Sequence, residues 1–365
     1  MHRILIFFVI IAFLLSACGS ATVTNISPTE ITIASTTPSI DATQLSTSVP
    51  VTQPAMTQSP PETGWLSALE TITPKNWARL QLLQTFPAEI PMLNSVVAIA
   101  PNGKTMLMGS NQKAQLFFFD LESGKISSES LYIHDVKNID APFDVIKYLS
   151  DGSILASSHG PYAIYHIDST GNVLSAWDGL EFSVSADQQT IAFEINDGTS
   201  LVNIANNTPM VLLQNTNGLG SSFSPDNSKI AIDTVTVDYA NVDIWDIKSQ
   251  TIIKTLDNMY DVSYSPNGKF LAMLDDVDSS LKIFSPDGAV LLATIPDAHS
   301  EYLISSDGSF IAYQTAKGSS VAKDTTNWET YETALQGSID SFSSDGRILV
   351  TRTDDGGVLI WGVRR

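Results

Sequence analysis

The sequence has one cysteine, few basic side chains and no apolar run as long as a membrane-spanning helix needs. Cys18 is the only cysteine among 365 residues, which excludes a disulfide framework and a thiolate metal site within the chain. Lysine and arginine number 19 against 39 aspartates and glutamates, so the formal net charge is −20. An acidic surface repels nucleic acid and anionic lipid headgroups. We therefore expect neutral, basic or cationic partners and no nucleic acid.

The sequence motifs of common catalytic sites are also missing. There is no Gly-x-Ser-x-Gly elbow of a hydrolase and no glycine-rich loop of the kind that cradles phosphate. Gly218-Leu-Gly220 lacks a third glycine and a following helix, so we interpret it as a turn between repeats. The five histidines are scattered, with no pair at metal-ligand spacing. We assign no catalytic residue, metal ligand or cofactor; His166 is interpreted as a core residue, and His159, on a loop, is kept as a candidate binding residue.

The first residues have the pattern of a targeting signal. A thin basic start, His2-Arg3, precedes the twelve apolar residues Ile4 to Leu15. That length suits the core of a signal peptide and falls short of the roughly 20 residues that a membrane-spanning helix needs. The next residues, Leu15-Ser-Ala-Cys18-Gly19, resemble a bacterial lipobox. The resemblance implies that residues 1–17 are removed and that Cys18 carries a lipid on the extracytoplasmic side of a bacterial membrane; an ordinary secretory signal is the alternative.

Residues 18–63 are expected to form a disordered tether behind the lipidated cysteine. Of the 45 residues from Gly19 to Thr63, 24 are Ser, Thr or Pro, and none is Lys or Arg. Such a segment buries too little apolar surface to offset the loss of chain entropy on folding. As a flexible coil it would hold the following domain roughly 35–40 Å from the membrane on average.

Residues 64–365 repeat one unit, which begins with a strand and a turn rich in Ser, Pro, Asp, Asn and Gly. Pro pre-sets the first turn position, and Asn, Asp and Gly tolerate positive φ at the next ones. The steps between the Asp or Asn positions of successive turns are 49, 36, 39, 41, 40 and 38 residues. The seven turns are Ala100-Pro-Asn102-Gly, Leu149-Ser-Asp151-Gly, Ser185-Ala-Asp187-Gln, Ser224-Pro-Asp226-Asn, Ser265-Pro-Asn267-Gly, Ser305-Ser-Asp307-Gly and Ser343-Ser-Asp345-Gly.

Four short apolar strands fit into each repeat, which is typical of a β-propeller blade. The sequence therefore predicts an all-β fold, a seven-bladed β-propeller over residues 64–365. The seventh repeat ends at Arg365 after its third strand. We expect the segment Trp77–Phe86 to supply the missing outer strand, because ring closure removes an open sheet edge and joins the two ends of the domain. In the sixth repeat, Val321–Thr326 is a weak third strand.

The repeats resemble WD-repeat propellers, in particular bacterial forms with Ser-Pro-Asp-Gly turns. The best match is Asp243-Ile-Trp245-Asp246, followed by Phe117-Phe-Phe-Asp120 and Leu359-Ile-Trp361-Gly362. The resemblance implies the propeller fold and packing of Trp177, Trp245 and Trp361 between blades. The Gly-His dipeptide of the family is absent, so the His–Ser–Trp–Asp hydrogen-bond network of eukaryotic members is not expected to be complete.

Acidic residues gather in the loops between the second and third strands, which emerge on one face of a propeller. Converging loops on a rigid ring are a common binding surface of repeat folds. The candidates on this face are Asp197, Asp233, Asp238, Asp275, Asp276, Asp278, Asp354 and Asp355. Three interpretations stay open: a solvated rim, a surface for a basic protein or cationic ligand, and a Ca²⁺ site at Asp275-Asp-Val-Asp278, although that segment lacks the glycine and spacing of a Ca²⁺ loop.

We therefore expect a monomeric, lipid-anchored propeller that serves as a binding scaffold in the cell envelope and touches the membrane through its lipid alone. Propellers also host hydrolases and quinoproteins, so an enzyme acting at the central channel is the alternative. A lipoprotein of an envelope complex, similar to the propeller of the Tol system, is a third hypothesis. A deep pocket with perturbed carboxylates at the channel mouth would favour the enzyme, and a flat acidic face would favour the binder.

Overall fold

The computed structural model describes residues 64–86, 97–109, 115–125, 131–132, 143–158, 162–179, 181–195, 197–214, 216, 218–235, 240–296, 298 and 302–365. The predictions made for Cys18, the tether, His159 and Asp238 lie outside the described residues. In the described part, no helix is long and apolar enough to span a membrane.

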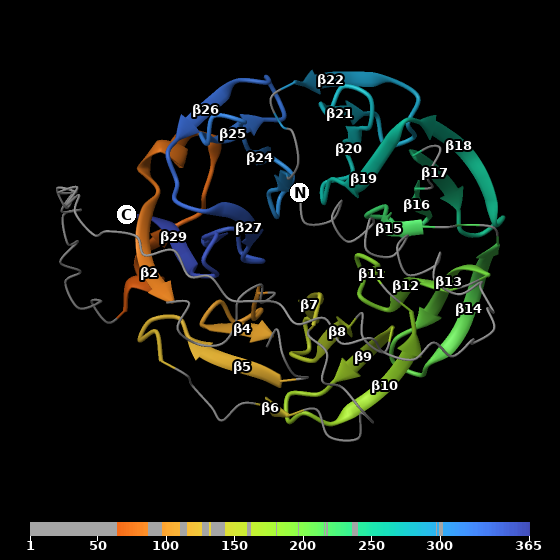
Figure 1. Cartoon of the computed structure of the whole chain (residues 1–365), viewed down its shortest axis with the longest axis horizontal. Coiled ribbons are helices and arrows are strands. Elements are labelled where there is room, and N and C mark those ends of the chain that lie inside the picture. The colour runs from red at the N-terminus through yellow and green to blue at the C-terminus, as the bar shows by residue number, and fades with distance from the viewer. Residues whose placement is uncertain are drawn as a thin grey trace, which may run out of the picture. The chain divides into compact units, whose positions relative to one another are not determined.

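Seven antiparallel sheets stand around a common axis, which confirms the predicted seven-bladed β-propeller (Figure 1). Blade 1 consists of β3 (Val97–Ile99), β4 (Thr105–Gly109), β5 (Gln115–Asp120) and β6 (Leu131–Tyr132). Blade 2 consists of β7 (Val145–Tyr148), β8 (Ile154–Ser158), β9 (Ala163–Ile167) and β10 (Val173–Asp178). Blade 3 consists of β11 (Phe182–Val184), β12 (Thr190–Ile195), β13 (Gly198–Asn203) and β14 (Thr208–Gln214). Blades 4 and 5 consist of β15 (Gly218–Phe223), β16 (Lys229–Val235), β17 (Ala240–Asp246) and β18 (Thr251–Asp257); and β19 (Met259–Tyr264), β20 (Leu271–Asp275), β21 (Leu281–Phe284) and β22 (Leu291–Ile295).

Blade 6 consists of β23 (Tyr302–Ile304), β24 (Phe310–Gln314), β25 (Ser320–Asp324) and β26 (Thr330–Thr333). Blade 7 consists of β27 (Ser338–Phe342), β28 (Leu349–Arg352) and β29 (Val358–Arg364), completed by β1 (Leu69–Glu70) and β2 (Gln81–Phe86). The segment expected to be a weak third strand in blade 6 is β25, whose first three residues are buried. Gly218–Gly220, interpreted as a turn, instead begins β15, and a register shift lies between those two glycines.

The repeated turns are held by their own side chains. In the blade 4 turn, the Ser224 hydroxyl donates to Asp226 Oδ1 at 2.6 Å, and Asp226 also accepts the Ser228 amide at 3.0 Å. Asn227 has φ 58°, the left-handed conformation that Asn tolerates. These hydrogen bonds, that of the Ser224 hydroxyl first, lower the pKa of Asp226 to about 2. The acidic residues of the turns therefore have a structural role, which explains why the repeat is visible in the sequence.

The hydrophobic core lies between neighbouring blades. Trp177 of blade 2 packs against Phe193 of blade 3, with ring centroids 6.0 Å apart, and both side chains are buried. The clusters that join the blades contain mainly Ile, Leu, Val and Phe from the middle strands. Trp245 and Trp361 are buried in the same way, as expected for packing between blades.

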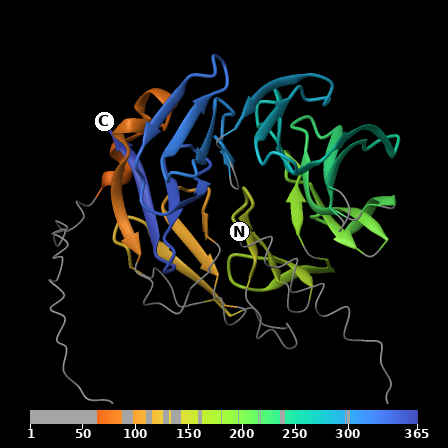
Figure 2. The same cartoon turned by 45° about the horizontal axis from the view of Figure 1, so that its top comes forward.

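The N-terminal segment closes the ring. β2 pairs antiparallel with β29 from Gln81–Gly362 to Phe86–Val358, and β1 extends the pairing with Leu69–Arg364. Figure 2 shows the orange N-terminal strand beside the blue C-terminal strand. The predicted closure is therefore confirmed, because both chain ends contribute to blade 7.

The start of the predicted closing strand is wrong. Residues 74–79 form the 3-10 helix η2 (Pro74–Arg79), and a second one, η1 (Trp65–Ala68), precedes β1. Pro74 stands at the first position of η2, where its missing N–H is harmless, and Asn76 Oδ1 accepts the Thr73 amide at 2.8 Å. The helix places Trp77, wholly buried, against Phe310 at 5.8 Å between ring centroids. The alternation of apolar residues in the sequence does not distinguish this arrangement from a strand.

A tryptophan-centred hydrogen bond is present in blade 7, and among the described residues blade 4 has no counterpart of it. The Trp361 indole N–H donates to Thr351 Oγ1 at 2.8 Å, and the Thr351 hydroxyl donates to the Gln336 carbonyl at 2.6 Å. Trp245 pairs in the same register, but Ile232 stands where Thr351 stands in blade 7. Among the described residues the Trp245 N–H has no acceptor. Among the described residues, the two tryptophans therefore share a strand register and differ in the hydrogen bonding of their indole N–H.

Candidate functional site on the acidic face

The loops between second and third strands and the links between blades share one face of the ring, which we call the loop face. Three of the acidic candidates are exposed there, and their carboxylates have no partner within the described part of the chain: Asp197, Asp276 and Asp354. The basic side chains beside them among the described residues are Lys282, Lys317 and Arg352. Two of these basic side chains are already paired, Lys282 with Asp278 and Arg352 with Asp340.

A lysine forms ion pairs with the first and last carboxylates of the segment Asp275–Asp278. Lys282 Nζ lies 3.3 Å from Asp275 Oδ2 and 2.7 Å from Asp278 Oδ2, and its side chain is only 14% exposed. Asp275 Oδ1 accepts the Val277 amide at 2.8 Å. Hydrogen bonds, that from Lys282 first, lower the pKa of Asp278 to about 2. The ammonium group occupies the position between the two carboxylates that a Ca²⁺ ion would need.

Asp355 also has a structural role in its loop. Its carboxylate accepts the Thr353 hydroxyl and the Gly357 amide, and these bonds, the hydroxyl first, lower its pKa. Asp276 and Asp354 make no such contact among the described residues, so within these two loops they are the carboxylates open to a partner.

Asp233 lies at the end of β16 and is buried, whereas the sequence placed it on an exposed loop. Its Oδ2 accepts the Asp261 amide at 2.8 Å and its Oδ1 accepts the Val262 amide at 3.1 Å. Both amides are released from the β19–β20 ladder by a register shift between Tyr260 and Ser263. Burial, and then the charge of Asp261, raise the pKa of Asp233 to about 8 in spite of the two amide donors.

This carboxylate joins three blades. Asp261, in blade 5, has φ 53°, a strained conformation for a residue other than glycine. Its amide is held by Asp233 of blade 4, and its carbonyl accepts the Tyr302 hydroxyl of blade 6 at 2.5 Å. The strain at Asp261 is therefore stabilised by side chains from the blades on both sides.

Glu194 of β12 is a half-buried carboxylate near the same face. It accepts the Thr199 hydroxyl at 2.9 Å and the Thr216 hydroxyl at 3.4 Å. Burial raises its pKa to about 7, and the two threonines and the Gly218 amide oppose that shift. The cavity beside it measures about 10 Å³ and is lined by Glu181, Glu194, Thr199, Gly218, Gly220, Ser221 and Ile232. A space of that size holds about one water molecule.

Two carboxylates with raised pKa thus lie on neighbouring blades, and the space beside Glu194 is about the size of one water molecule. The described part of the chain thus contains perturbed carboxylates of the kind that would favour an enzyme. In the same part of the chain, no group of three or more His, Cys, Asp or Glu side chains is placed to hold a metal ion. The arrangement can bind protons at Glu194 and Asp233 and cations at the exposed aspartates.

Glu181, Glu194 and Asp261 are not among the residues predicted from the sequence. A signal existed for two of them, because Glu181 and Asp261 each stand four residues before the first residue of their turn, Ser185 and Ser265. That position is the loop-face end of the innermost strand. Glu194 carries no such signal, since it continues the apolar strand β12.

His166 is a core residue, as interpreted from the sequence. Its side chain is 6% exposed, and Nε2 lies 2.9 Å from Ser153 Oγ, which donates to Asp151 Oδ1 at 2.6 Å. Burial lowers the pKa of His166, so the imidazole is neutral at pH 7. Trp328 is half-buried against the cluster around Phe270 and Tyr313. Neither residue belongs to an open site.

No family model matches this chain, and no curated protein matches it either. The fold and the side chains described above therefore carry the functional argument.

Proposed function

We propose that the protein is a lipid-anchored, extracytoplasmic propeller whose loop face binds a basic protein or a cationic ligand. The observation that carries the proposal is the set of exposed aspartates on separate blades, Asp197, Asp276 and Asp354, whose carboxylates have no partner among the described residues. The neighbouring aspartates 275, 278 and 355 are already used to hold their loops. A rigid ring that keeps free carboxylates apart fits a broad, positively charged surface better than a single ion.

The acidic face is tested by the double variant Asp276→Asn, Asp354→Asn. Exposed charges of this kind contribute about 0.2–1 kcal/mol each, so for the two together we expect roughly two- to thirtyfold weaker binding of the partner and a smaller salt dependence. The measurement is recovery of crosslinked partners from cells, followed by affinity measurement with the recovered partner. A partner retained equally by both chains would contradict the proposal and direct attention to the opposite face.

A matched control removes the same amount of charge elsewhere. Glu329→Gln with Glu332→Gln takes two carboxylates from the third turn and outer strand of blade 6, away from the loop face. Glu329 contributes one hydrogen bond, from the Tyr331 hydroxyl, and both side chains are exposed. We expect this variant to bind as the wild type does. Equal loss in both variants would mean that net charge, and not the loop face, governs binding.

The anchor is tested separately with Cys18→Ala. Acylation requires the thiol of Cys18, the only one in the chain. We expect the wild-type protein to sediment with membranes and to incorporate a labelled fatty acid, and the variant to lose both properties. Retention of label in the variant would contradict lipidation at Cys18.

A further inference from the structure

Two blades carry the same four-residue turn, Pro-Asn-Gly-Lys, at residues 101–104 and 266–269. Both asparagines are exposed, and each is followed by a glycine with φ near 65°: 64° at Gly103 and 67° at Gly268. Asn-Gly is the sequence most prone to deamidation, because a glycine offers no side chain to hinder attack by its own amide nitrogen. The intrinsic chemistry of the two turns is therefore equal, and any difference between them comes from the fold.

The turn backbones restrain the two reactions alike. The Gly103 amide donates to the Ala100 carbonyl at 2.8 Å, and the Gly268 amide donates to the Ser265 carbonyl at 2.9 Å. Each asparagine Oδ1 accepts the amide of the lysine two residues later, at 2.8 Å from Lys104 and 3.1 Å from Lys269. The attacking nitrogen is thus equally engaged in both turns.

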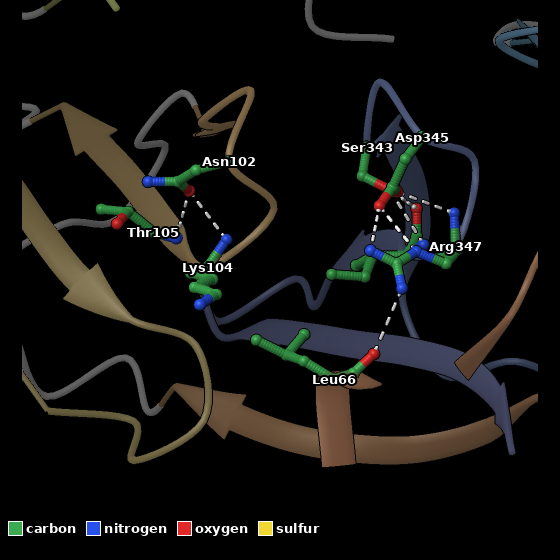
Figure 3. Close-up of polar contacts among 8 residues, drawn as sticks. Leu66, Asn102, Lys104, Thr105, Ser343, Asp345 and Arg347 are labelled. Carbon is green, nitrogen blue, oxygen red and sulfur yellow. Dashed lines mark hydrogen bonds and ion pairs between the residues drawn. The ribbon is translucent and has the colours of Figure 1, made fainter. Parts of the chain in front are cut away.

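The side-chain amide is held firmly in one turn only. Asn267 Nδ2 donates to the carbonyls of Asp307 at 3.2 Å and Gly308 at 2.9 Å, both in blade 6. The Ser265 hydroxyl adds a bond of 3.0 Å to Asn267 Oδ1. In the first turn Ala100 replaces that serine, and within the described residues Asn102 Nδ2 has no acceptor. Figure 3 shows the Asn102 carbonyl facing the amides of Lys104 and Thr105 while its NH₂ group points away from them.

We propose that Asn102 is a site of spontaneous deamidation and that the same sequence at Asn267 is protected by the neighbouring blade. The Gly103 nitrogen gives its proton to solvent base and attacks Cγ of Asn102. A C–N bond forms and the Nδ2 group leaves as ammonia, which produces a succinimide. Water then opens the ring. Cleavage at Cγ leaves an aspartate at position 102, and cleavage at the α-carbonyl leaves an isoaspartate, with the chain running through Cγ.

The two products have different consequences for the ring. An aspartate matches the turns of the other blades, five of which carry Asp at this position. An isoaspartate adds a methylene to the backbone and displaces Gly103 from its bond to the Ala100 carbonyl. Gly103 lies at the seam with blade 7, where an added Cβ would be 3.5 Å from Asp345 Oδ2 and 4.0 Å from Arg347 Nη2. Isoaspartate formation would therefore loosen the contact between blade 1 and the closing blade.

The test is peptide mapping of the intact, folded protein during incubation at pH 8 and 37 °C, with separation of asparagine, aspartate and isoaspartate forms. Because Asn267 must break extra hydrogen bonds before its side chain can reorient, we expect conversion at Asn102 to be at least about tenfold faster. Equal rates, or faster conversion at Asn267, would overturn the proposal.

Two controls separate structure from sequence. In denaturant, the identical Pro-Asn-Gly-Lys segments should react at similar rates; a large difference there would show that the fold is not responsible. Ala100→Ser introduces the hydroxyl that Ser265 supplies in blade 5, and we expect it to slow conversion at Asn102 in the folded protein. An unchanged rate in a variant with wild-type melting behaviour would contradict the role assigned to the side-chain bonds.

Discussion

Deletion of residues 76–86 is expected to abolish cooperative unfolding and to leave the protein aggregated. The deletion removes β2, which pairs with β29 from Gln81 to Phe86, and leaves β29 unpaired on that side from Val358 to Gly362. It also removes Trp77, which is wholly buried and donates its indole N–H to the Ser320 carbonyl at 3.2 Å. Circular dichroism melting and size-exclusion chromatography measure the result. A shortened protein with the wild-type melting curve would contradict closure by this segment.

Single tryptophan substitutions test the same closure with smaller changes in the free energy of unfolding. Trp77→Ala leaves a cavity between blades 6 and 7, and loss of a large buried aromatic lowers the free energy of unfolding by about 3–5 kcal/mol. Trp77→Phe keeps much of the volume and leaves the Ser320 carbonyl without its donor. In contrast, Trp245→Phe removes an indole N–H that has no acceptor among the described residues. We therefore expect it to destabilise the protein less than Trp77→Phe does. The reverse order would disprove the assignment of Trp77 as the central residue of the closure.

Asp233 and Glu194 are expected to lower the free energy of unfolding as the pH rises from 5 to 9, whereas His166, whose pKa burial lowers, acts in the opposite direction near its ordinary pKa. The pKa of Asp233 is raised to about 8 and that of Glu194 to about 7, so the folded protein binds these protons more tightly than the unfolded chain does. Their stabilising contribution is complete below the ordinary pKa of a carboxyl and is lost as the pH passes through about 7 and 8. Each group changes stability by at most about 1.4 kcal/mol per pH unit in that interval.

The turn carboxylates act in the opposite direction but at lower pH. Asp226, with its pKa lowered to about 2, stabilises the fold above the ordinary carboxyl pKa and loses that contribution only as the pH falls below about 4. It therefore does not affect the slope between pH 5 and 9. The two sets of carboxylates together predict maximal stability at mildly acidic pH.

Urea unfolding at several pH values, with wild type and Asp233→Asn, measures the effect. Removing the titrating group should make the variant gain stability relative to wild type as the pH rises, by a few kcal/mol between pH 5 and 9. Asp226→Asn is the matched control, since it breaks a turn without changing the slope in this interval. Parallel curves for wild type and Asp233→Asn would show that Asp233 does not titrate in this range.

The blade architecture could be predicted because its determinants are local. In each turn a side-chain oxygen of Asp or Asn accepts the backbone amide two residues later, as Asp226 accepts that of Ser228. This bond needs no help from distant parts of the chain. The turn therefore recurs in the sequence with the period of the fold. The shortage of a fourth strand in the last repeat similarly implied a partner strand from the other end of the domain, and β2 supplies it.

The roles of single acidic residues could not be predicted in the same way. Asp233 and Asp276 are both next to a strand end in the sequence, yet one is buried against amides of the next blade and the other is exposed. Burial of Asp233 depends on a register shift in β19, which is a property of paired strands. Likewise, the ion pairs of Lys282 with Asp275 and Asp278 depend on the conformation of the β20–β21 loop.

The sequence by itself thus determined the number of blades, their turns and the excess of acidic loops, because these follow from short-range chemistry and composition. Only the tertiary structure decided which carboxylates are exposed, which are buried and which form hydrogen bonds between blades. The two Pro-Asn-Gly-Lys turns make the distinction clear: identical residues differ in reactivity because blade 6 offers two carbonyls to Asn267, whereas Asn102 Nδ2 finds no acceptor in the described part of the chain. Contacts between blades, which join residues about 40 positions apart, are set by the closed ring and not by the local pattern.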